Sequence, residues 1–204
     1  MDLPELLIIY RGLGPDDVLA ASDALYATGV TAFETTMDSP GALTSIAGLS
    51  RRFGDALIGA GSVRTPAHVK AAADAGAAFL LSPHLDEEMV AATKAAGLVS
   101  IPGAFTPTEV VRAHAAGADL VKIFPIAPAG AEYVRQLRQP LPDVPLLATG
   151  GLTAELARQC LLAGCATVGV GAGLIDADAV RDGDWDRLAH GALRYLAVLR
   201  GEDQ

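Results

Sequence analysis

Apolar and polar positions follow one recurring unit along this chain: a short apolar run, a turn, and a segment of helical character that ends at a glycine. A short apolar run bounded by turn residues indicates a buried strand. Runs of this kind cover residues 6–11, 31–36, 57–63, 79–84, 98–104, 120–125, 145–151 and 167–174. They predict eight strands separated by helices.

The helix signals recur in a similar form. A capping residue precedes a proline, which suits the first helical position, and a glycine follows where a left-handed C-cap is needed. The openers are Gly14-Pro15, Ser39-Pro40, Thr65-Pro66 and Thr106-Pro107, joined by Asp86 and Thr153, and the closers are Gly29, Gly54, Gly76, Gly117, Gly97 and Gly164. Thr106 and Glu109 have the spacing of a capping box. A last helix, over about residues 184–200, has the predicted inner stripe Trp185, Leu188, Leu193, Leu196 and Leu199.

Strands and helices that alternate at roughly 20–25 residues per unit predict a small (β/α)₈ TIM barrel. We interpret residues 1–204 as a single barrel domain. An open doubly wound sheet is the alternative, and it would normally place a G-x-G-x-x-G motif after the first strand. The first strand is instead followed by Tyr10-Arg11-Gly12-Leu13-Gly14, which does not fit that motif.

Composition narrows the class of partner. The chain has 204 residues, 51% of them hydrophobic, which is enough for one full core. A net charge of −9 without a lysine or arginine cluster disfavours nucleic acid and anionic membrane as partners. Cys160 and Cys165 are too few for a disulfide framework or a zinc site, and the first residues lack a signal-peptide pattern. We expect a reduced, cytosolic protein with no membrane-spanning segment.

One lysine lies within an otherwise apolar run. Lys122 is predicted to share a strand face with Leu120 and Phe124. Loss of hydration would lower the pKa of its ammonium group towards neutrality, and a neutral amine is the nucleophile that forms a Schiff base. The alternative is a lysine at a strand end whose stem is buried and whose head lies in water.

Barrels place their chemistry at the carboxyl ends of the strands. Glu34 lies near the carboxyl end of the second predicted strand, where it could exchange protons with a substrate bound at Lys122. Its alternative role is an ion pair with Lys122 or Arg11. The last two strands end in the glycine-rich turns Thr149-Gly150-Gly151 and Gly169-Val170-Gly171-Ala172-Gly173. Such turns can bind phosphate through backbone N–H groups, or they can simply relieve crowding.

Together these segments resemble the pyruvate-type class I aldolases that cleave 2-keto-3-deoxy-6-phosphogluconate or 2-keto-3-deoxy-6-phosphogalactonate. The resemblance runs from about residue 6 to residue 174. The segments that carry it are Ile8-Ile9-Tyr10-Arg11-Gly12, Phe33-Glu34-Thr35-Thr36, Ile58-Gly59-Ala60-Gly61-Ser62-Val63, Ser82-Pro83, Ile101-Pro102-Gly103, Val121-Lys122-Ile123-Phe124-Pro125 and Ala148-Thr149-Gly150-Gly151.

The resemblance implies a role for each candidate. Lys122 would form the Schiff base with pyruvate, and Glu34 would be the general acid–base. Arg11 would bind the pyruvyl carboxylate, and its alternative role is an ion pair with Glu34 or Asp38. The other substrate contacts implied are Ser62, Pro83, Phe124, Thr149, Gly150, Gly151, Gly171 and Ala172. Relatives of this kind need no metal or other cofactor and are typically homotrimers. The products would be pyruvate and glyceraldehyde 3-phosphate.

Four positions depart from the family pattern. Asp38 stands where gluconate-type members have an arginine, and galactonate-type members have an arginine where this chain has Arg11. Ala172 replaces a serine of the phosphate turn. His84 and Phe105 stand where smaller residues are usual, which leaves open which aldehyde is bound and whether its phosphate is required.

Other functions remain open on the sequence alone. The aldolase could act on another 2-keto acid, such as 4-hydroxy-2-oxoglutarate. A metal-dependent aldolase could use Glu34 and Asp38 as ligands. A phosphate-binding isomerase or synthase barrel, or a non-catalytic sugar-acid binding module, would keep the glycine turns without needing a reactive Lys122.

Overall fold

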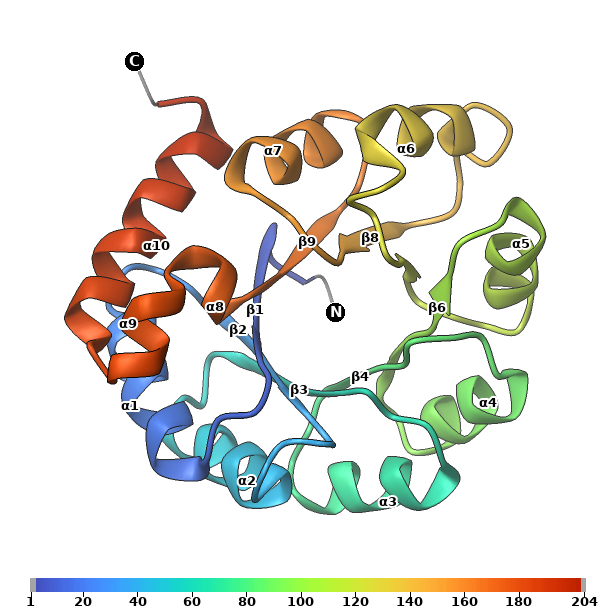
Figure 1. Ribbon diagram of the computed structural model, residues 1–204. Coiled ribbons are helices and arrows are strands. Elements are labelled where there is room, and N and C mark those ends of the chain that lie inside the picture. The colour runs from blue at the N-terminus through green and yellow to red at the C-terminus, as the bar shows by residue number, and fades with distance from the viewer. Residues whose placement is uncertain (1–2, 203–204) are drawn as a thin grey trace.

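The computed structural model describes residues 3–202. Parallel strands form a ring, and helices surround it as an outer layer (Figure 1). This is the (β/α)₈ barrel that the repeating unit predicted. The strands are β1 (Leu6–Tyr10), β2 (Ala32–Thr36), β3 (Leu57–Gly61), β4 (Phe79–Leu81), β5 (Val99–Ile101), β6 (Gly103–Ala104), β7 (Val121–Ile123), β8 (Leu146–Thr149) and β9 (Thr167–Gly171).

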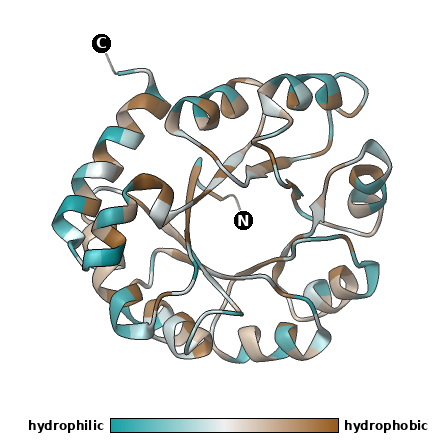
Figure 2. Ribbon diagram, in the orientation of Figure 1, coloured by the Kyte–Doolittle hydropathy of each residue, from teal (hydrophilic) through white to brown (hydrophobic). Residues whose placement is uncertain are grey.

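The helices follow the strands in order. They are α1 (Pro15–Tyr26), α2 (Ala42–Arg52), α3 (Pro66–Asp74), α4 (Glu87–Ala95), α5 (Pro107–Ala115), α6 (Gly130–Arg138), α7 (Ala154–Leu162), α8 (Ala172–Ile175), α9 (Ala177–Asp182) and α10 (Trp185–Arg200). Polar residues lie mainly on the outward faces of these helices (Figure 2). Side-chain caps form at Thr65, Asp86, Thr153 and Asp184, and the predicted capping box of Thr106 and Glu109 is present.

The fifth strand of the barrel is divided in two. Pro102 separates β5 from β6, and proline has no N–H group for the ladder. The first part pairs with β4, with Leu81 opposite Ile101, and the second part pairs with β7, with Gly103 opposite Lys122. Because β5 and β6 belong to one continuous chain segment, they close the ring between β4 and β7. Elsewhere in the ring, the strand β1 pairs with β9.

The strands bury both of their faces. Every second residue points into the barrel, where one apolar cluster consists of Leu7, Ala32, Phe79, Leu81, Ile101, Leu120 and Leu147. The alternate residues, such as Ile8, Phe33 and Val121, pack against the helices in a second and larger cluster. The inner cluster fills the barrel below the carboxyl ends of the strands. Polar side chains that point inward therefore gather at its mouth.

Several predicted boundaries were wrong. The helix expected to open at Ser39-Pro40 begins at Ala42, with Gly41 in the left-handed conformation at its N-cap. The last predicted strand, 167–174, ends at Gly171, because the next residues turn into α8. Leu193 was expected on the inner face of the last helix but is half exposed. Gly191, Ala192 and Tyr195 are buried there instead.

Candidate active site

Lys122 lies in the middle of β7 and points into the barrel. Its neighbour two residues earlier, Leu120, belongs to the inner apolar cluster, so the lysine stands one layer above it. The side chain is 7% exposed, and its Nζ lies 4.9 Å from the centroid of the Phe124 ring. The predicted face of Leu120, Lys122 and Phe124 is thus confirmed, and the ammonium group is almost completely removed from water.

Glu34 approaches from the opposite side of the ring. It is 1% exposed, and its Oε2 atom has no hydrogen-bond partner among the described residues. Space for the carboxylate comes from Gly61 on the adjacent strand, because a Cβ atom there would overlap Glu34 Oε1. Gly59 leaves room for the Phe79 ring in the same way. The two glycines of β3 are therefore packing requirements of the site, a role that the sequence analysis missed.

Burial shifts the two ionisable groups in opposite directions. The low-polarity surroundings raise the pKa of Glu34 above its ordinary value, although the charges of Lys122 and Arg11 oppose that shift. Burial lowers the pKa of Lys122. The negative charge of Glu34 raises that pKa, and the positive charge of Arg11 lowers it further. Both shifts favour the neutral forms, a free amine and a protonated carboxyl. Across residues 3–202, no ion pair or direct hydrogen bond joins these two side chains.

Arg11 extends from the end of β1 across the ends of the next two strands. Its Nη1 atom forms an ion pair with Asp38 Oδ2 at 2.6 Å, and its Nη2 atom donates a hydrogen bond to Ser62 Oγ at 3.0 Å. Ser62 has a positive φ of 54°, which is uncommon for a residue with a side chain. The ion pair with Asp38, one of the roles left open for Arg11, is therefore present, and more than half of the guanidinium side chain remains exposed.

A hydroxyl network fixes the loop beneath this ion pair. Ser39 Oγ accepts the N–H of Gly12 at 2.9 Å and shares a hydrogen bond with Thr36 Oγ1 at 2.8 Å. Ser39, expected as a helix cap, thus links the end of β1 to the end of β2. These bonds tie together Gly12 and Ser39, the residues that follow Arg11 and Asp38 in the sequence.

The turn after β8 packs against the segment that follows Lys122. Thr149 is buried at the strand end, and Gly150 and Gly151 have φ angles of 99° and 74°. A Cβ atom on Gly150 would lie 3.0 Å from the Phe124 ring. The N–H groups of Ile126 and Ala127 donate to the carbonyls of Thr149 and Gly150 at 2.9 and 3.0 Å. Glycine is needed here both for the backbone angles and for close approach.

The turn after β9 leads directly into α8. Gly171 is the N-cap residue, with extended backbone, and Ala172 is the first helical residue, with its side chain buried. The buried methyl group shows why a residue without a hydroxyl fits at position 172. No hydrogen bond from these residues to Lys122 or Glu34 occurs in the described part of the chain.

The remaining candidates line the ends of β4 and β6. Gly103 packs on the backbone of Pro83, where a Cβ atom would lie 2.5 Å from the Pro83 carbonyl oxygen. The carbonyl of His84 accepts a hydrogen bond from Ser82 Oγ at 2.7 Å, and the imidazole is exposed. Phe105 stacks on Tyr133 of α6, with 5.4 Å between the ring centroids. The bulk of Phe105 is therefore supported from the helix layer.

Potential metal ligands are scattered rather than grouped. Within the described range, no three His, Cys, Asp or Glu side chains come together as metal ligands would. Glu34 and Asp38, proposed as ligands in the metal-dependent alternative, belong to different environments, one buried and one in the exposed ion pair with Arg11.

No helix in residues 3–202 has the length and apolar character needed to cross a membrane.

Several known proteins have sequences similar to this chain. The family model for KDPG and KHG aldolase matches residues 6–190. The 2-dehydro-3-deoxy-6-phosphogalactonate aldolase of Escherichia coli K12 is 38% identical over 171 residues, which cover 83% of each chain. The 2-dehydro-3-deoxy-phosphogluconate aldolase of Pseudomonas aeruginosa is 32% identical over 189 residues, covering 90% of this chain and 86% of the relative.

Solved structures of aldolases also superpose on this chain. A native KDPGal structure superposes with a TM-score of 0.88 at 35% identity, covering 98% of this chain and 96% of the other. The KDPG aldolase of Legionella pneumophila, with pyruvate captured at low pH as a covalent carbinolamine intermediate, gives a TM-score of 0.84 at 28% identity, covering 94% and 93%. A carbinolamine is the adduct that a class I aldolase forms. With its buried lysine and carboxylate at the barrel mouth, this chain belongs to the KDPG and KHG aldolase family and is a class I aldolase.

Proposed function

We propose that this enzyme cleaves a 2-keto-3-deoxy-6-phospho sugar acid, of the galactonate or gluconate series, into pyruvate and glyceraldehyde 3-phosphate. The observation that carries the proposal is the burial of Lys122 at the mouth of the barrel, with its pKa lowered by loss of water. An uncharged amine there can attack a ketone. Relatives named for both substrate series support the substrate class.

Lys122 Nζ attacks the C2 ketone, and loss of water gives a protonated imine. Cleavage of the C3–C4 bond sends its electron pair to the imine nitrogen, which leaves an enamine of pyruvate and releases the aldehyde. Protonation of C3 and addition of water then free pyruvate and restore the amine. The imine is the electron sink, so the proposed reaction needs no metal or other cofactor.

Glu34 is the proposed proton carrier. It would take the proton of the C4 hydroxyl as the C3–C4 bond breaks and return a proton to C3 of the enamine. A carboxyl whose pKa is raised by burial serves this purpose, because it holds a proton more readily than an exposed carboxylate and can then return it to the substrate. The unpartnered Oε2 atom leaves one oxygen free for the substrate or a water molecule.

Arg11 and Ser62 are the proposed clamp for the pyruvyl carboxylate. They are already joined by the bond from Nη2 to Oγ, and the guanidinium fork suits a planar carboxylate. Thr149 would add a hydroxyl, while Pro83 and Phe124 would wall the pocket. The backbone N–H groups around Gly150, Gly151, Gly171 and Ala172 would bind the phosphate. Arginine at the end of β1, rather than at position 38, favours the galactonate series.

Borohydride reduction in the presence of pyruvate tests the nucleophile. We expect one reduced pyruvyl group per chain, located on Lys122 by peptide mass spectrometry, and no labelling of Lys122→Arg, whose guanidinium group stays protonated.

Both trapping and cleavage should survive exhaustive chelation. Labelling at Lys70 or Lys94, or loss of cleavage with EDTA and recovery with magnesium or manganese, would favour the other functions. Cleavage of 4-hydroxy-2-oxoglutarate in place of the phosphorylated acids would identify the alternative substrate.

We also propose that the protein works as a homotrimer in a reducing cytosol, with small keto acids and neither nucleic acid nor membrane as partners. The trimer rests on the family resemblance, and light scattering measures it directly. Both cysteines are free and buried, and burial raises the pKa of Cys160 to about 11 and that of Cys165 to about 12. Thiols of this kind are unreactive, which suits a reducing compartment.

A further inference from the structure

The helix α8 is too short to maintain its own shape. It has four residues and begins directly after β9. A single turn fixes many backbone angles for very few hydrogen bonds, so it depends on its surroundings. Gly171 and Ala172, at the start of this turn, are among the residues to which we assign the substrate phosphate. Their backbone N–H groups can meet a phosphate only if the rest of the turn is held in place.

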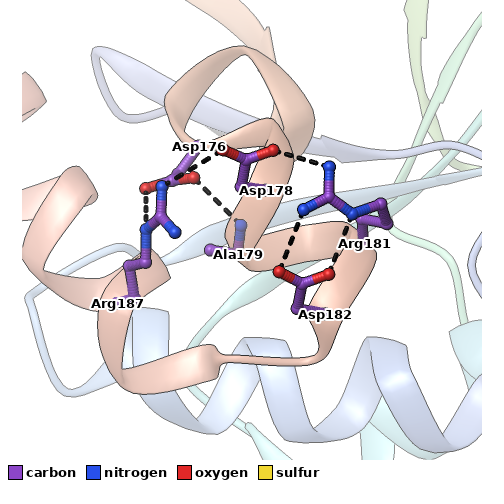
Figure 3. Close-up of polar contacts among 6 residues, drawn as sticks. All are labelled: Asp176, Asp178, Ala179, Arg181, Asp182 and Arg187. Atoms are coloured by element: carbon purple, nitrogen blue, oxygen red, sulfur yellow. Dashed lines mark hydrogen bonds and ion pairs between the residues drawn. The ribbon is translucent and has the colours of Figure 1, made fainter.

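Asp176 links the end of α8 to two other helices. Its Oδ1 atom accepts the N–H of Ala179 at 2.9 Å, which caps α9, and its Oδ2 atom accepts Arg187 Nε of α10 at 2.8 Å. The aspartate side chain is only 11% exposed. The bond from the Ala179 N–H group, together with Arg187, holds the pKa of Asp176 below its ordinary value despite burial. The carboxylate is therefore charged and has two fixed partners (Figure 3).

The helix α10 also touches α8 at a glycine. A Cβ atom on Gly191 would lie 3.0 Å from Ile175 Cγ2 and 3.6 Å from the Ile175 carbonyl oxygen. Glycine within a helix is less favourable than alanine. Close packing against Ile175 gives a reason for a glycine here. The helix α10 thus contacts two consecutive residues: Gly191 packs on Ile175, and Arg187 forms an ion pair with Asp176.

A second arginine nearby provides a contrast. Arg181 forms ion pairs with Asp178 at 2.7 Å and with Asp182 at 2.8 Å, and all three side chains are more than half exposed. These contacts lie within α9 and do not include Asp176 (Figure 3). Arg187 approaches the same network only weakly, with 3.6 Å to Asp178 Oδ2. The two arginines have the same chemistry, but only Arg187 contacts the residue that ends α8.

We infer that Arg187 is a positioning residue for recognition of the substrate phosphate: its ion pair with Asp176 holds α8, and so holds the backbone N–H groups at the start of that turn. This inference rests on the proposed function, because it presumes that the phosphate binds there. Arg187 does not touch the reacting atoms, so its loss should change phosphate recognition and leave imine formation unaltered.

The test compares two substrates in matched variants. Cleavage of a 2-keto-3-deoxy-6-phospho sugar acid and of the same acid without its phosphate is measured for the wild type, Arg187→Gln, Arg187→Lys and Arg181→Gln. In Arg187→Gln we expect the KM for the phosphorylated acid to rise roughly three- to tenfold, because small displacements of positioning groups are costly. Its kcat, its KM for the unphosphorylated acid and pyruvate trapping at Lys122 should stay unchanged. Arg187→Lys should recover part of the loss, and Arg181→Gln should match the wild type.

The outcomes separate this inference from the function on which it rests. A wild type that does not prefer the phosphorylated acid overturns the phosphate site and the inference together. A wild type with that preference, retained in full by Arg187→Gln, overturns the positioning role alone. Equal KM increases for both acids would show a general structural defect and would also reject it. If Arg187→Gln does not fold, Asp176→Asn replaces it, since asparagine retains the acceptor for Ala179.

Discussion

The two sides of the barrel mouth are made of different chemical groups. Near the ends of β1, β2 and β3 the structure has a charged or hydroxyl side chain for each strand, namely Arg11, Glu34 and Ser62, and Arg11 bonds to both Asp38 and Ser62. At the ends of β8 and β9 it has mainly glycine, with Gly150 and Gly151 at positive φ. Side chains titrate and can move, whereas backbone N–H groups do neither, so the first side suits proton transfer and the second suits a permanently charged anion.

Lys122 lies between these sides and is coupled to both. On the side formed by β1, β2 and β3, the charge of Glu34 raises the pKa of Lys122. Phe124, which lies over its Nζ atom, is in contact range of Gly150 on the glycine side. A change on either side can therefore reach the nucleophile. The variants below ask whether the two sides can be altered separately.

Glu34→Gln should have the largest effect, because it removes the proton carrier. We expect kcat to fall on the order of 10²–10⁴-fold, the usual scale for a general acid–base group. Borohydride should still trap pyruvate on Lys122, only more slowly. Unchanged turnover would remove Glu34 from the mechanism.

The same variant should be more stable than the wild type at neutral pH. The pKa of Glu34 is higher in the folded than in the unfolded chain, so the folded state binds the proton more tightly, and this contribution to stability is lost as pH rises through the folded pKa. Glutamine does not ionise, so its melting temperature should exceed that of the wild type at neutral pH. The difference should shrink as the buffer is made more acidic.

Arg11→Lys tests the clamp on the same side. Lysine keeps the charge but loses the planar fork of N–H groups, so it cannot contact Asp38 and Ser62 together in the same way. We expect pyruvate binding to weaken by about 1.5–3 kcal/mol, the scale of a charge-assisted hydrogen bond. Arg52→Lys is the matched control, since Arg52 forms its ion pair with Asp23 between α1 and α2, outside the site. Unchanged pyruvate affinity in a folded Arg11→Lys protein would reject the clamp and the preference for the galactonate series.

Gly150→Ala alters the glycine side and should have the smallest effect on the chemistry. Its φ of 99° disfavours a side chain, and the new Cβ atom would press on Phe124. Gly117→Ala is the control, because Gly117 has a φ of 95° and a Cβ atom there would meet no other atom within 4 Å. Both variants should lose about 1–3 kcal/mol of unfolding free energy from backbone strain. Only Gly150→Ala should raise the KM for the phosphorylated acid, as steady-state kinetics would show.

Local signals in the sequence predicted much of this architecture. The cap at Thr65 and the capping box at Thr106 involve residues within one turn of each other, so their pattern is sufficient. Ser39 has the same appearance, but its hydroxyl bonds to Thr36, three residues earlier, and to Gly12, which the pairing of β1 with β2 brings to it. The prediction for Leu193 failed for a related reason: the packing of α1, α7, α8 and α9 on α10 determines which side of that helix is covered.

The site was predictable in kind but not in its contacts. An isolated lysine in an apolar run and a glutamate at a strand end indicated the chemistry. The sequence left open whether Arg11 pairs with Asp38 or with Glu34, because that depends on side-chain directions at three strand ends. The role of Gly61 could have been found, since Glu34 and Gly61 lie on adjacent predicted strands, but only with the register that places Thr36 opposite Gly61.

The pairing of β1 with β9 has a consequence for biosynthesis. Leu6 lies opposite Val168, so β1, which is synthesised before β9, has one edge uncovered until β9 has been made. Until then the nascent chain presents an apolar strand with unpaired N–H and C=O groups, the kind of edge that joins other chains. Chains interrupted before Thr167 lack β9 and keep that edge open permanently. For this barrel, premature termination therefore yields a species prone to aggregation rather than a smaller working enzyme.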